Sequence, residues 1–250
     1  MNNLEHYLTK KISAKEIVST PFPHFIIENF LPNDVLNKYL ANFPKKSIIK
    51  NGVSTSKNRK NIMHEENSSE KFYIDNQSFV NISLDIENIL LKHVSYKYKD
   101  FVDFDINELN KDLFIRRDIC LAENGYKRSP HIDREYHFVI NFLYLNDPYT
   151  DDSKGGELIL HEFKDSYKNT NLCNDKFPEI SSLKNIVSIK PKKNLFVSFL
   201  RNNNSYHSVP EMRKFENTRK FIFFGIDSRY DIWDKKDTRS EDRFKKFLSE

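Results

Sequence analysis

Apolar residues in the first part of the chain recur at helical spacing between polar ones. After the apolar, β-compatible run Phe25–Ile27, the residues Pro32-Asn33-Asp34 predict a helix start, with Pro in the first turn and Asn or Asp as the cap. A second helix is predicted from Phe79 to about Tyr98, where apolar residues share one face. Residues 50–70 are polar and predict a long mobile loop. The N-terminal part is therefore expected to be mainly helical.

The pattern changes after about residue 112, where helical spacing gives way to short runs of β-forming residues separated by turn signals. Many short strands with almost no helix between them predict a sandwich or barrel. The predicted strands are Leu113–Leu121, His137–Leu145, Glu157–Leu160, Ile186–Ile189, Leu195–Leu200 and Phe221–Ile226. The last residues, SEDRFKKFLSE, predict a short helix.

This pattern divides the chain into three regions. Residues 1–110 are expected to be helical support that is integral to the fold, residues 111–230 a β domain, and residues 231–250 a helical tail. The 250 residues include 21 Phe and 12 Tyr, and this supply of core side chains excludes intrinsic disorder. The formal net charge of +4 is too small to indicate nucleic acid and instead suggests a lysine-rich, solvated surface.

Cysteine content and hydropathy predict the compartment. The two cysteines, Cys120 and Cys173, are too few for a secreted disulfide scaffold. The first 20 residues carry charges throughout and do not resemble a signal peptide. The chain also lacks the roughly 18–20 consecutive apolar residues that a membrane span requires. We therefore expect a soluble, cytoplasmic protein without a membrane partner.

The sequence His131-Ile132-Asp133 is the first candidate for chemistry. Strand side chains alternate between two faces, so a His and an Asp two positions apart can point the same way and bind one metal ion. With 8 His and 36 acidic residues, chance alone gives about one such pair. The chain holds two, the other being His64-Glu65-Glu66, so spacing by itself does not identify a site.

The surrounding sequence separates the two pairs. His64 lies in the polar stretch and is interpreted as a solvated histidine. His131, in contrast, opens an ordered series of features. They are a strand ending Tyr144-Leu145-Asn146, the turn and strand Gly155-Gly156-Glu157-Leu158, the strand Leu195–Phe199 that leads to Tyr206-His207, and Arg219 before a last strand. The series is far more specific than any of its members.

Over residues 113–227 this series resembles the iron(II)- and 2-oxoglutarate-dependent oxygenases, in particular their prolyl-hydroxylase-like branch. The resemblance implies a double-stranded β-helix, a jelly roll or cupin-like fold, packed against N-terminal helices. This agrees with the strands predicted above. The class is therefore expected to be mainly β with helical support.

The resemblance also implies roles for single residues. His131, Asp133 and His207 match the three iron ligands, and two His with one carboxylate leave positions open for cosubstrate and O2. Arg219 matches the residue that pairs with the distal carboxylate of 2-oxoglutarate, a task that suits a guanidinium fork. Tyr144 matches a tyrosine that some members aim at the same carboxylate. Leu121 departs from relatives that have a tyrosine there, so the polar shell of the cosubstrate is incomplete.

The expected reaction is hydroxylation, because Asp133 keeps the carboxylate that related halogenases lack. Its coproducts would be succinate and CO2. Family resemblance leaves the substrate open among a prolyl peptide, a free amino acid and a small metabolite. His137 and His161 are interpreted as a strand histidine and a loop histidine.

Other functions stay open at this stage. One is a non-catalytic jelly-roll protein that binds a metal or a glycan. Another is a zinc hydrolase, which would use the same ligands but would not need Arg219. Arg213 is a rival for the role of Arg219, but it lies in a polar turn. Arg213 also follows His207 too closely to match the paired arginines of the nucleic-acid-demethylating branch, so nucleic acid is not an expected partner.

Overall fold

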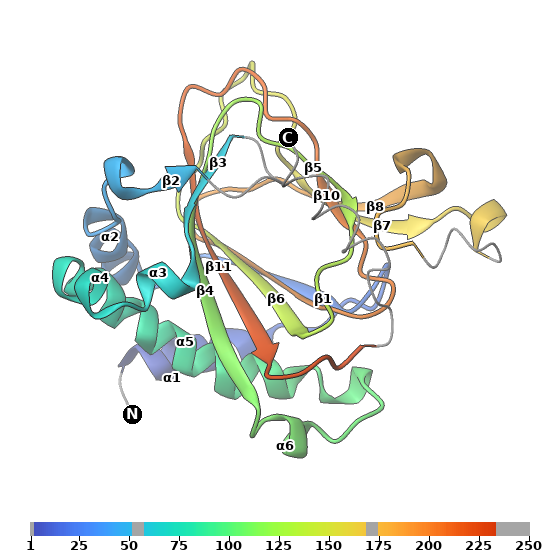
Figure 1. Cartoon of the computed structure of the whole chain (residues 1–250), viewed down its shortest axis with the longest axis horizontal. Helices are drawn as coiled ribbons and strands as arrows, with labels where there is room; N and C mark the ends of the chain where they lie inside the picture. Colours follow the sequence, from blue (N-terminus) through green and yellow to red (C-terminus); the bar gives the residue numbers. More distant parts are fainter. Residues whose placement is uncertain (1–2, 52–57, 169–174, 234–250) are drawn as a thin grey trace, which may run out of the picture.

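A computed structural model describes residues 3–51, 58–168 and 175–233 of the chain (Figure 1). The helices are α1 (Asn3–Ala14), α2 (Asn33–Ala41), α3 (His64–Asn67), α4 (Glu70–Asp75), α5 (Gln77–Lys97) and α6 (Ile106–Leu109). Short 3-10 turns are η1 (Lys46–Ile48), η2 (Lys99–Phe101), η3 (Asp165–Tyr167) and η5 (Ile180–Ser182). The strands are β1 (His24–Glu28), β2 (Lys50–Asn51), β3 (Arg59–Ile62), β4 (Leu113–Ala122), β5 (Arg128–His131), β6 (His137–Tyr144), β7 (Leu158–Phe163), β8 (Leu183–Ile189), β9 (Leu195–Leu200), β10 (His207–Val209) and β11 (Arg219–Ser228).

The strands form two antiparallel sheets. The larger sheet has seven strands in the order β1-β9-β6-β11-β4-β3-β2, and the smaller has four in the order β5-β10-β7-β8 (Figure 1). Most neighbours in the two sheets are not consecutive along the chain, as in the pairs β1-β9, β6-β11 and β10-β7, and this is typical of a jelly roll. The predicted fold class, a mainly β double-stranded β-helix with helical support, is confirmed.

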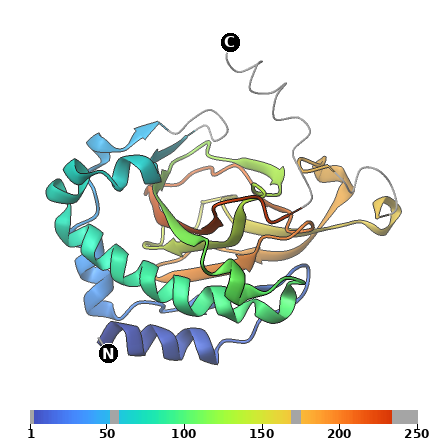
Figure 2. The same cartoon turned by 60° about the horizontal axis from the view of Figure 1, so that its bottom comes forward.

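The helices cover the outer face of the larger sheet. Figure 2 shows α1 and α5 side by side along this face. The apolar face of α5 buries Phe79, Val80, Ile86, Ile89, Leu90 and Val94, which recur at the spacing of an amphipathic helix. Helix α2 is fixed to α5 by Tyr39, whose ring stacks on Phe79 at 4.5 Å and whose hydroxyl is 2.7 Å from Ser83 Oγ. The predicted helix from Phe79 is thereby confirmed.

Strand β4 separates two hydrophobic cores. Its residues Ile119 and Leu121 join the core beneath the helices, whereas Cys120 and Ala122 join the core between the two sheets. This is the alternation that a strand buried on both faces must show. The inner core is rich in aromatic side chains, including Tyr126, Tyr144, Phe199 and Phe221. Several of the aromatic side chains of the protein therefore lie between the two sheets.

Strands from the N-terminal region complete the larger sheet. Strand β1 pairs with β9, and β3 pairs with β4. Helix α6 ends at Leu109 and β4 begins at Leu113, close to the boundary expected at residue 110. The division into residues 1–110, 111–230 and 231–250 stays a prediction, and the tail predicted to be helical lies outside the described residues. No helix in the described part of the chain is long and apolar enough to span a bilayer.

The long loop predicted for residues 50–70 is wrong in the part that the structure describes. Strand β3 and helix α3 lie within it, and α4 begins at Glu70. Asn61 lies opposite Cys120 of β4 and is buried. The strand Arg-Lys-Asn-Ile is polar because one of its faces looks into the space between the sheets, so it lacks the alternation that marks a strand in sequence.

The six strands predicted after residue 112 are all present, with ends shifted by up to a few residues. Strands β5 and β10 were not predicted, because each is very short and contains polar residues. The predicted cap of α2 is also wrong. Its N-cap is Pro32, which has no side-chain donor or acceptor to offer, and the residues Asn33 and Asp34 lie inside the first turn.

Candidate metal centre and active site

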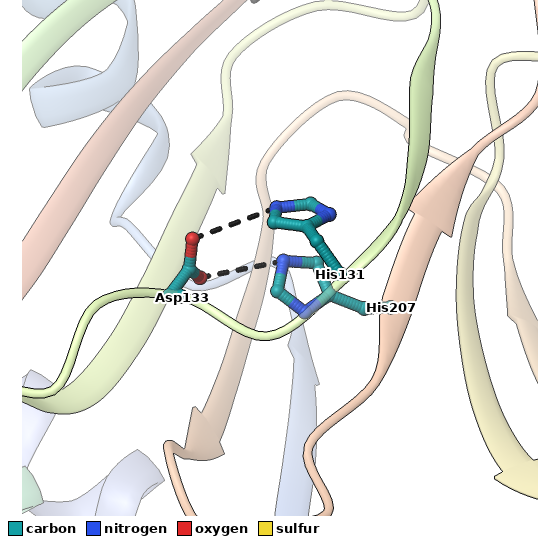
Figure 3. A group of neighbouring side chains, drawn as sticks. All are labelled: His131, Asp133 and His207. Atoms are coloured by element: carbon teal, nitrogen blue, oxygen red, sulfur yellow. Dashed lines mark ion pairs between the residues drawn. The ribbon is translucent and has the colours of Figure 1, made fainter. Parts of the chain in front are cut away.

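Three side chains from the β5–β10 region meet between the two sheets. His131 ends β5, Asp133 follows two residues later, and His207 begins β10 (Figure 3). His131 and His207 lie directly opposite each other in the β5–β10 pair, so their side chains project to the same face. Their ring centroids are 4.3 Å apart. The pairing of two short strands thus brings together histidines that are 76 positions apart in the sequence.

The Asp133 carboxylate faces both rings. Its Oδ1 is 3.5 Å from His131 Nε2, and its Oδ2 is 3.3 Å from His207 Nε2 (Figure 3). Both His side chains are about 5% exposed and that of Asp133 is 19% exposed. The possible ligand atoms all lie within 4.8 Å of one another, and no other such group occurs among the described residues. The predicted ligand set is therefore assembled by the fold.

The two histidines are oriented in the same way. Nδ1 of His131 donates to the Ser129 carbonyl oxygen at 2.8 Å, and Nδ1 of His207 donates to the Ser205 carbonyl oxygen at 3.0 Å. A proton held on Nδ1 leaves the lone pair on Nε2, the nitrogen that points to Asp133. Such bonds fix the tautomer and the ring orientation of metal-binding histidines. The backbone thereby presents both lone pairs to the same point.

The protonation states of the three groups suit a cation. Burial, followed by the nearby Arg128 guanidinium, lowers the pKa of His131 to about 3. Burial also lowers the pKa of His207. For Asp133 burial alone would raise the pKa, but His207 and His131 hold it well below its usual range. Two neutral imidazoles and one carboxylate are the forms that bind a metal.

These residues fit iron(II). Two imidazoles and one carboxylate on one side of an ion form the facial set typical of non-haem iron(II) oxygenases, and they leave coordination positions open. A closed structural zinc site would need a fourth protein ligand, which the described residues do not supply.

The loop that carries Asp133 is held from the side of β9. Arg201 is fully buried, and its Nε and Nη2 both donate to the Asp133 main-chain oxygen at 3.1 Å. On the other side, the main-chain N–H of Ile132 donates to the Lys176 carbonyl oxygen, and Lys176 Nζ bonds Glu135 at 2.9 Å. These contacts fix the ligand without touching its carboxylate. Sequence analysis did not identify Arg201, because its partner is a backbone atom 68 residues away.

Arg219 lies where the sequence predicted, at the start of β11, and is 2% exposed. Its Nη1 donates to the Gly156 carbonyl oxygen, and its Nε has no hydrogen-bond partner among the described residues. The rings of Tyr126 and Tyr144 lie 5.2 Å and 5.8 Å from its guanidinium carbon. Burial raises the pKa of Tyr144. A buried guanidinium with an unused donor, surrounded by aromatic rings, can bind a carboxylate.

Gly155 and Gly156 adopt positive φ angles of 72° and 84°. A Cβ on Gly155 would lie only 2.1 Å from the Glu211 carbonyl oxygen, so no other residue fits there. The rival arginine, Arg213, is exposed and pairs with Glu211 at 2.9 Å. The structure therefore places Arg219, and not Arg213, in the interior.

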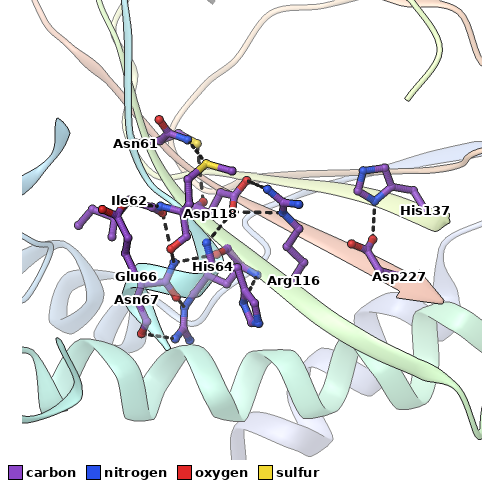
Figure 4. Close-up of polar contacts among 12 residues, drawn as sticks. Asn61, Ile62, His64, Glu66, Asn67, Arg116, Asp118, His137 and Asp227 are labelled. Carbon is purple, nitrogen blue, oxygen red and sulfur yellow. Dashed lines mark hydrogen bonds and ion pairs between the residues drawn. The ribbon is translucent and has the colours of Figure 1, made fainter. Parts of the chain in front are cut away.

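The interpretation of two other histidines is wrong. His64 is half-buried and bonded: its ring Nδ1 accepts a hydrogen bond from the Arg117 main-chain N–H at 3.1 Å, and its main-chain N–H donates to Asp118 Oδ1 at 3.0 Å (Figure 4). His161 is not in a loop but is buried inside β7, where Nε2 is 2.7 Å from Ser208 Oγ. In both cases the partner comes from a distant strand. His137 does begin β6, as predicted, and pairs with Asp227 (Figure 4).

An aromatic wall extends from the triad along the inner face of the larger sheet. The ring of Phe199 is 5.0 Å from that of His207, and Phe142 and Phe223 continue the series at 6.2 Å and 5.7 Å. The far end of this wall is His137, whose ring lies 5.9 Å from Phe223. These side chains would limit the access of water to the metal and shape the space for a substrate.

One family model matches the β region of the chain. Residues 118–225 match the model described as the 2OG-Fe(II) oxygenase superfamily. No curated protein sequence matches the chain.

Solved structures share the fold at low identity. One is a prolyl hydroxylase from Trichoplax adhaerens in complex with a hypoxia inducible factor peptide fragment, with 15% identity, a TM-score of 0.54, and coverage of 90% of this chain and 89% of that one. A prolyl 4-hydroxylase from Phytophthora capsici has 12% identity and a TM-score of 0.54, with coverage of 92% and 67%. HygX from Streptomyces hygroscopicus, solved with nickel and 2-oxoglutarate, has 10% identity, a TM-score of 0.50 and coverage of 83% of both chains.

The family match includes Asp133, His207 and Arg219, and it favours a catalytic oxygenase over a non-catalytic binding protein. The expected cofactors, iron(II) and 2-oxoglutarate, are those of the superfamily. Residues 118–225 are thus a 2OG-Fe(II) oxygenase domain, the domain of 2-oxoglutarate-dependent dioxygenases.

Proposed function

We propose that the protein hydroxylates a C–H bond of a small-molecule or peptide substrate, consuming O2 and 2-oxoglutarate and releasing succinate and CO2. The observation that carries this proposal is the buried triad, in which the Asp133 carboxylate is present and faces both histidines. Iron(II) bound there would supply the oxidising chemistry.

The protein's own residues hold and orient the reactants. His131, Asp133 and His207 would hold the metal, and Arg201 keeps the Asp133 backbone in place. Arg219, with its unused Nε donor, would fix the distal carboxylate of 2-oxoglutarate, with Tyr144 beside it. The aromatic wall would exclude water from the reacting atoms.

The proposed substrate classes are those found in solved structures with a similar fold. The Trichoplax adhaerens structure contains a peptide fragment, and HygX has also been solved with hygromycin B bound. Both peptides and small molecules are therefore reasonable substrate classes for this chain. A cytoplasmic location is part of the proposal, because Cys120 is a free, buried thiol and a reducing compartment keeps iron ferrous.

Succinate formation tests the proposed reaction. The full chain, supplied with iron(II), O2 and 2-oxoglutarate, should form succinate, and a substrate screen should detect a product that has gained one oxygen atom. Asp133→Ala should lower succinate formation by at least about 100-fold, because the metal loses its only anionic ligand. Asp147→Ala removes the same charge from an exposed loop and should leave the rate unchanged. Failure of the wild type to bind or turn over 2-oxoglutarate would contradict the proposal.

A further inference from the structure

Two arginines lie on either side of Ala122 on the inner face of the larger sheet. Ala122 of β4 is opposite Arg219 of β11 on one side and opposite Arg59 of β3 on the other. Directly opposed residues of neighbouring strands project to the same face. Arg59 therefore points toward the same space as Arg219, between the two sheets.

Arg59 has a donor that the fold leaves unused. Its Nε is buried and has no hydrogen-bond partner among the described residues. Its side chain hydrogen-bonds Tyr126, and in the described ranges no carboxylate forms an ion pair with it. Asp118 acts on it electrostatically but forms its ion pair with Arg116, at 3.3 Å. Arg59 is half-buried as a whole, and a shielded N–H without a partner is costly unless a ligand provides an acceptor.

A third arginine lies at the edge of the metal centre. Arg128 of β5 donates from Nε to His131 Nε2 at 3.2 Å. That nitrogen carries the lone pair that faces Asp133, so a metal ion held by His131 would take the acceptor that Arg128 now uses. The Arg128 N–H would then need another acceptor, which an anion could supply.

The three guanidinium groups gather around one ring. Tyr126 hydrogen-bonds Arg59, lies 5.2 Å from the Arg219 guanidinium carbon, and acts electrostatically on Arg128. Arg59 and Arg128 are close enough to repel each other. An anion bound between Arg59 and Arg128 would offset this repulsion.

We propose that Arg59 and Arg128 form a second anion subsite, which binds a carboxylate of the substrate while Arg219 binds the cosubstrate. This inference rests on the proposed function and narrows its substrate class. Because Arg128 lies 3.2 Å from a ligand nitrogen, the bound carboxylate is only a few bonds from the carbon that faces the metal. The substrate is therefore a small carboxylic acid such as a free amino acid, and not a proline within a peptide, whose neighbours are neutral amides.

Binding of trifluoroacetate, a small carboxylate, tests the subsite without requiring turnover. The full chain is loaded with zinc(II) in place of iron and saturated with 2-oxoglutarate, and the ¹⁹F line width of trifluoroacetate is measured. The wild type should broaden the line. Arg59→Gln should weaken trifluoroacetate binding by about tenfold while the Kd of 2-oxoglutarate changes by less than about twofold. Arg59→Lys, which keeps the charge without the fork, should give an intermediate value.

The matched control is Lys60→Gln. Lys60 is the next residue of the same strand, lies opposite Leu121 and projects to the other face, so this variant loses the same charge outside the space between the sheets. It should bind trifluoroacetate like the wild type. Melting temperatures of all variants verify that they are folded.

Three results would overturn the inference. They are unchanged trifluoroacetate binding in Arg59→Gln, equal weakening in Lys60→Gln, or a rise in the Kd of 2-oxoglutarate for Arg59→Gln as large as that for Arg219→Gln. The last result would make Arg59 a ligand of the cosubstrate. Absence of succinate formation, in contrast, would contradict the proposed function and leave these binding results interpretable by themselves.

In a turnover screen, free amino acids should stimulate succinate formation, and their carboxamides should be poorer by about 100-fold in kcat/KM, because they cannot pair with the guanidinium groups. Equal activity with the carboxamides, or a preference for blocked proline peptides, would also overturn the inference.

Discussion

Arg117 and Arg219 are nearly equally buried on the same sheet, yet they face opposite sides and have different partners. Arg117, on β4, is 3% exposed at its side chain and forms an ion pair with Glu87 of α5. Its Nε also donates to Asn67 Oδ1 at 2.9 Å. Arg219 is 2% exposed, and among the described residues it donates only to a main-chain oxygen and leaves its Nε without a partner.

This difference indicates that the charge of Arg117 stabilises the fold, whereas the charge of Arg219 serves to bind a ligand. On the helix side the chain supplies its own anion, so the charge of Arg117 helps to join α3 and α5 to the sheet. On the inner side Arg219 and Arg59 have no such anion among the described residues, and an incoming ligand would provide it. Burial alone would not distinguish the two cases. The chemical identity of each partner does.

Removing Arg117 should have the largest effect on stability. Arg117→Met leaves the Glu87 carboxylate buried without a partner, and breaking a buried pair costs about 3–5 kcal/mol of the free energy of unfolding. Urea denaturation measures this loss. The double variant Arg117→Met/Glu87→Leu should recover most of it, since neither charge remains. A single variant as stable as the wild type would refute the structural role.

Removing Arg219 should act on binding instead. Arg219→Met should raise the Kd of 2-oxoglutarate by about 100-fold, about 2.7 kcal/mol, through the loss of charge-assisted hydrogen bonds. Calorimetric titration of the zinc(II)-loaded protein measures this change. The free energy of unfolding should stay within about 1 kcal/mol of the wild type, because Arg219 forms no ion pair with the part of the chain that the structure describes. A loss of stability as large as that of Arg117→Met would remove the distinction between the two faces.

His161 is a buried group that the fold keeps neutral, and it should make stability depend on pH. Burial lowers the pKa of His161 to about 4, below the 6.5 of a free histidine. Between these values the unfolded chain binds a proton that the folded chain does not, so stability falls as the pH decreases. At pH 5 the loss should be about 2 kcal/mol relative to pH 7.5. In the metal-free protein, His161→Gln should remove this difference of about 2 kcal/mol in the free energy of unfolding between pH 7.5 and pH 5, as measured by urea denaturation. An unchanged difference would count against this assignment.

The smallest effect is expected at Arg201, whose partner is a backbone oxygen. Arg201→Met should weaken metal binding by about tenfold, because the loop that carries Asp133 loses its two hydrogen bonds. Titration with zinc(II) measures the affinity. Arg213→Met, on the exposed turn, is the matched control and should bind metal normally. Equal affinities of the two variants would show that other contacts suffice to hold the loop.

The amino-acid sequence by itself determined helix α5, the six longer strands of the β region and the candidate ligand set. Helix α5 and the long strands could be predicted because their residues repeat at the period of the element they form. His131, Asp133, His207 and Arg219 could be proposed from an ordered series of motifs. The order of these motifs along the chain supported the proposal, whereas the spacing of His131 and Asp133 alone did not identify a site.

Tertiary structure alone decided which polar residues face the site. Strands β3, β5 and β10 are too short and too polar to be recognised, yet they place Arg59, Arg128 and His207 in one space. His64 and His131 look alike in sequence, and only distant strands make one a backbone acceptor and place the other in the His-Asp-His triad. The physical reason is that a buried polar group is defined by its partners, and here the partners come from strands that are adjacent in the sheet but far apart in sequence.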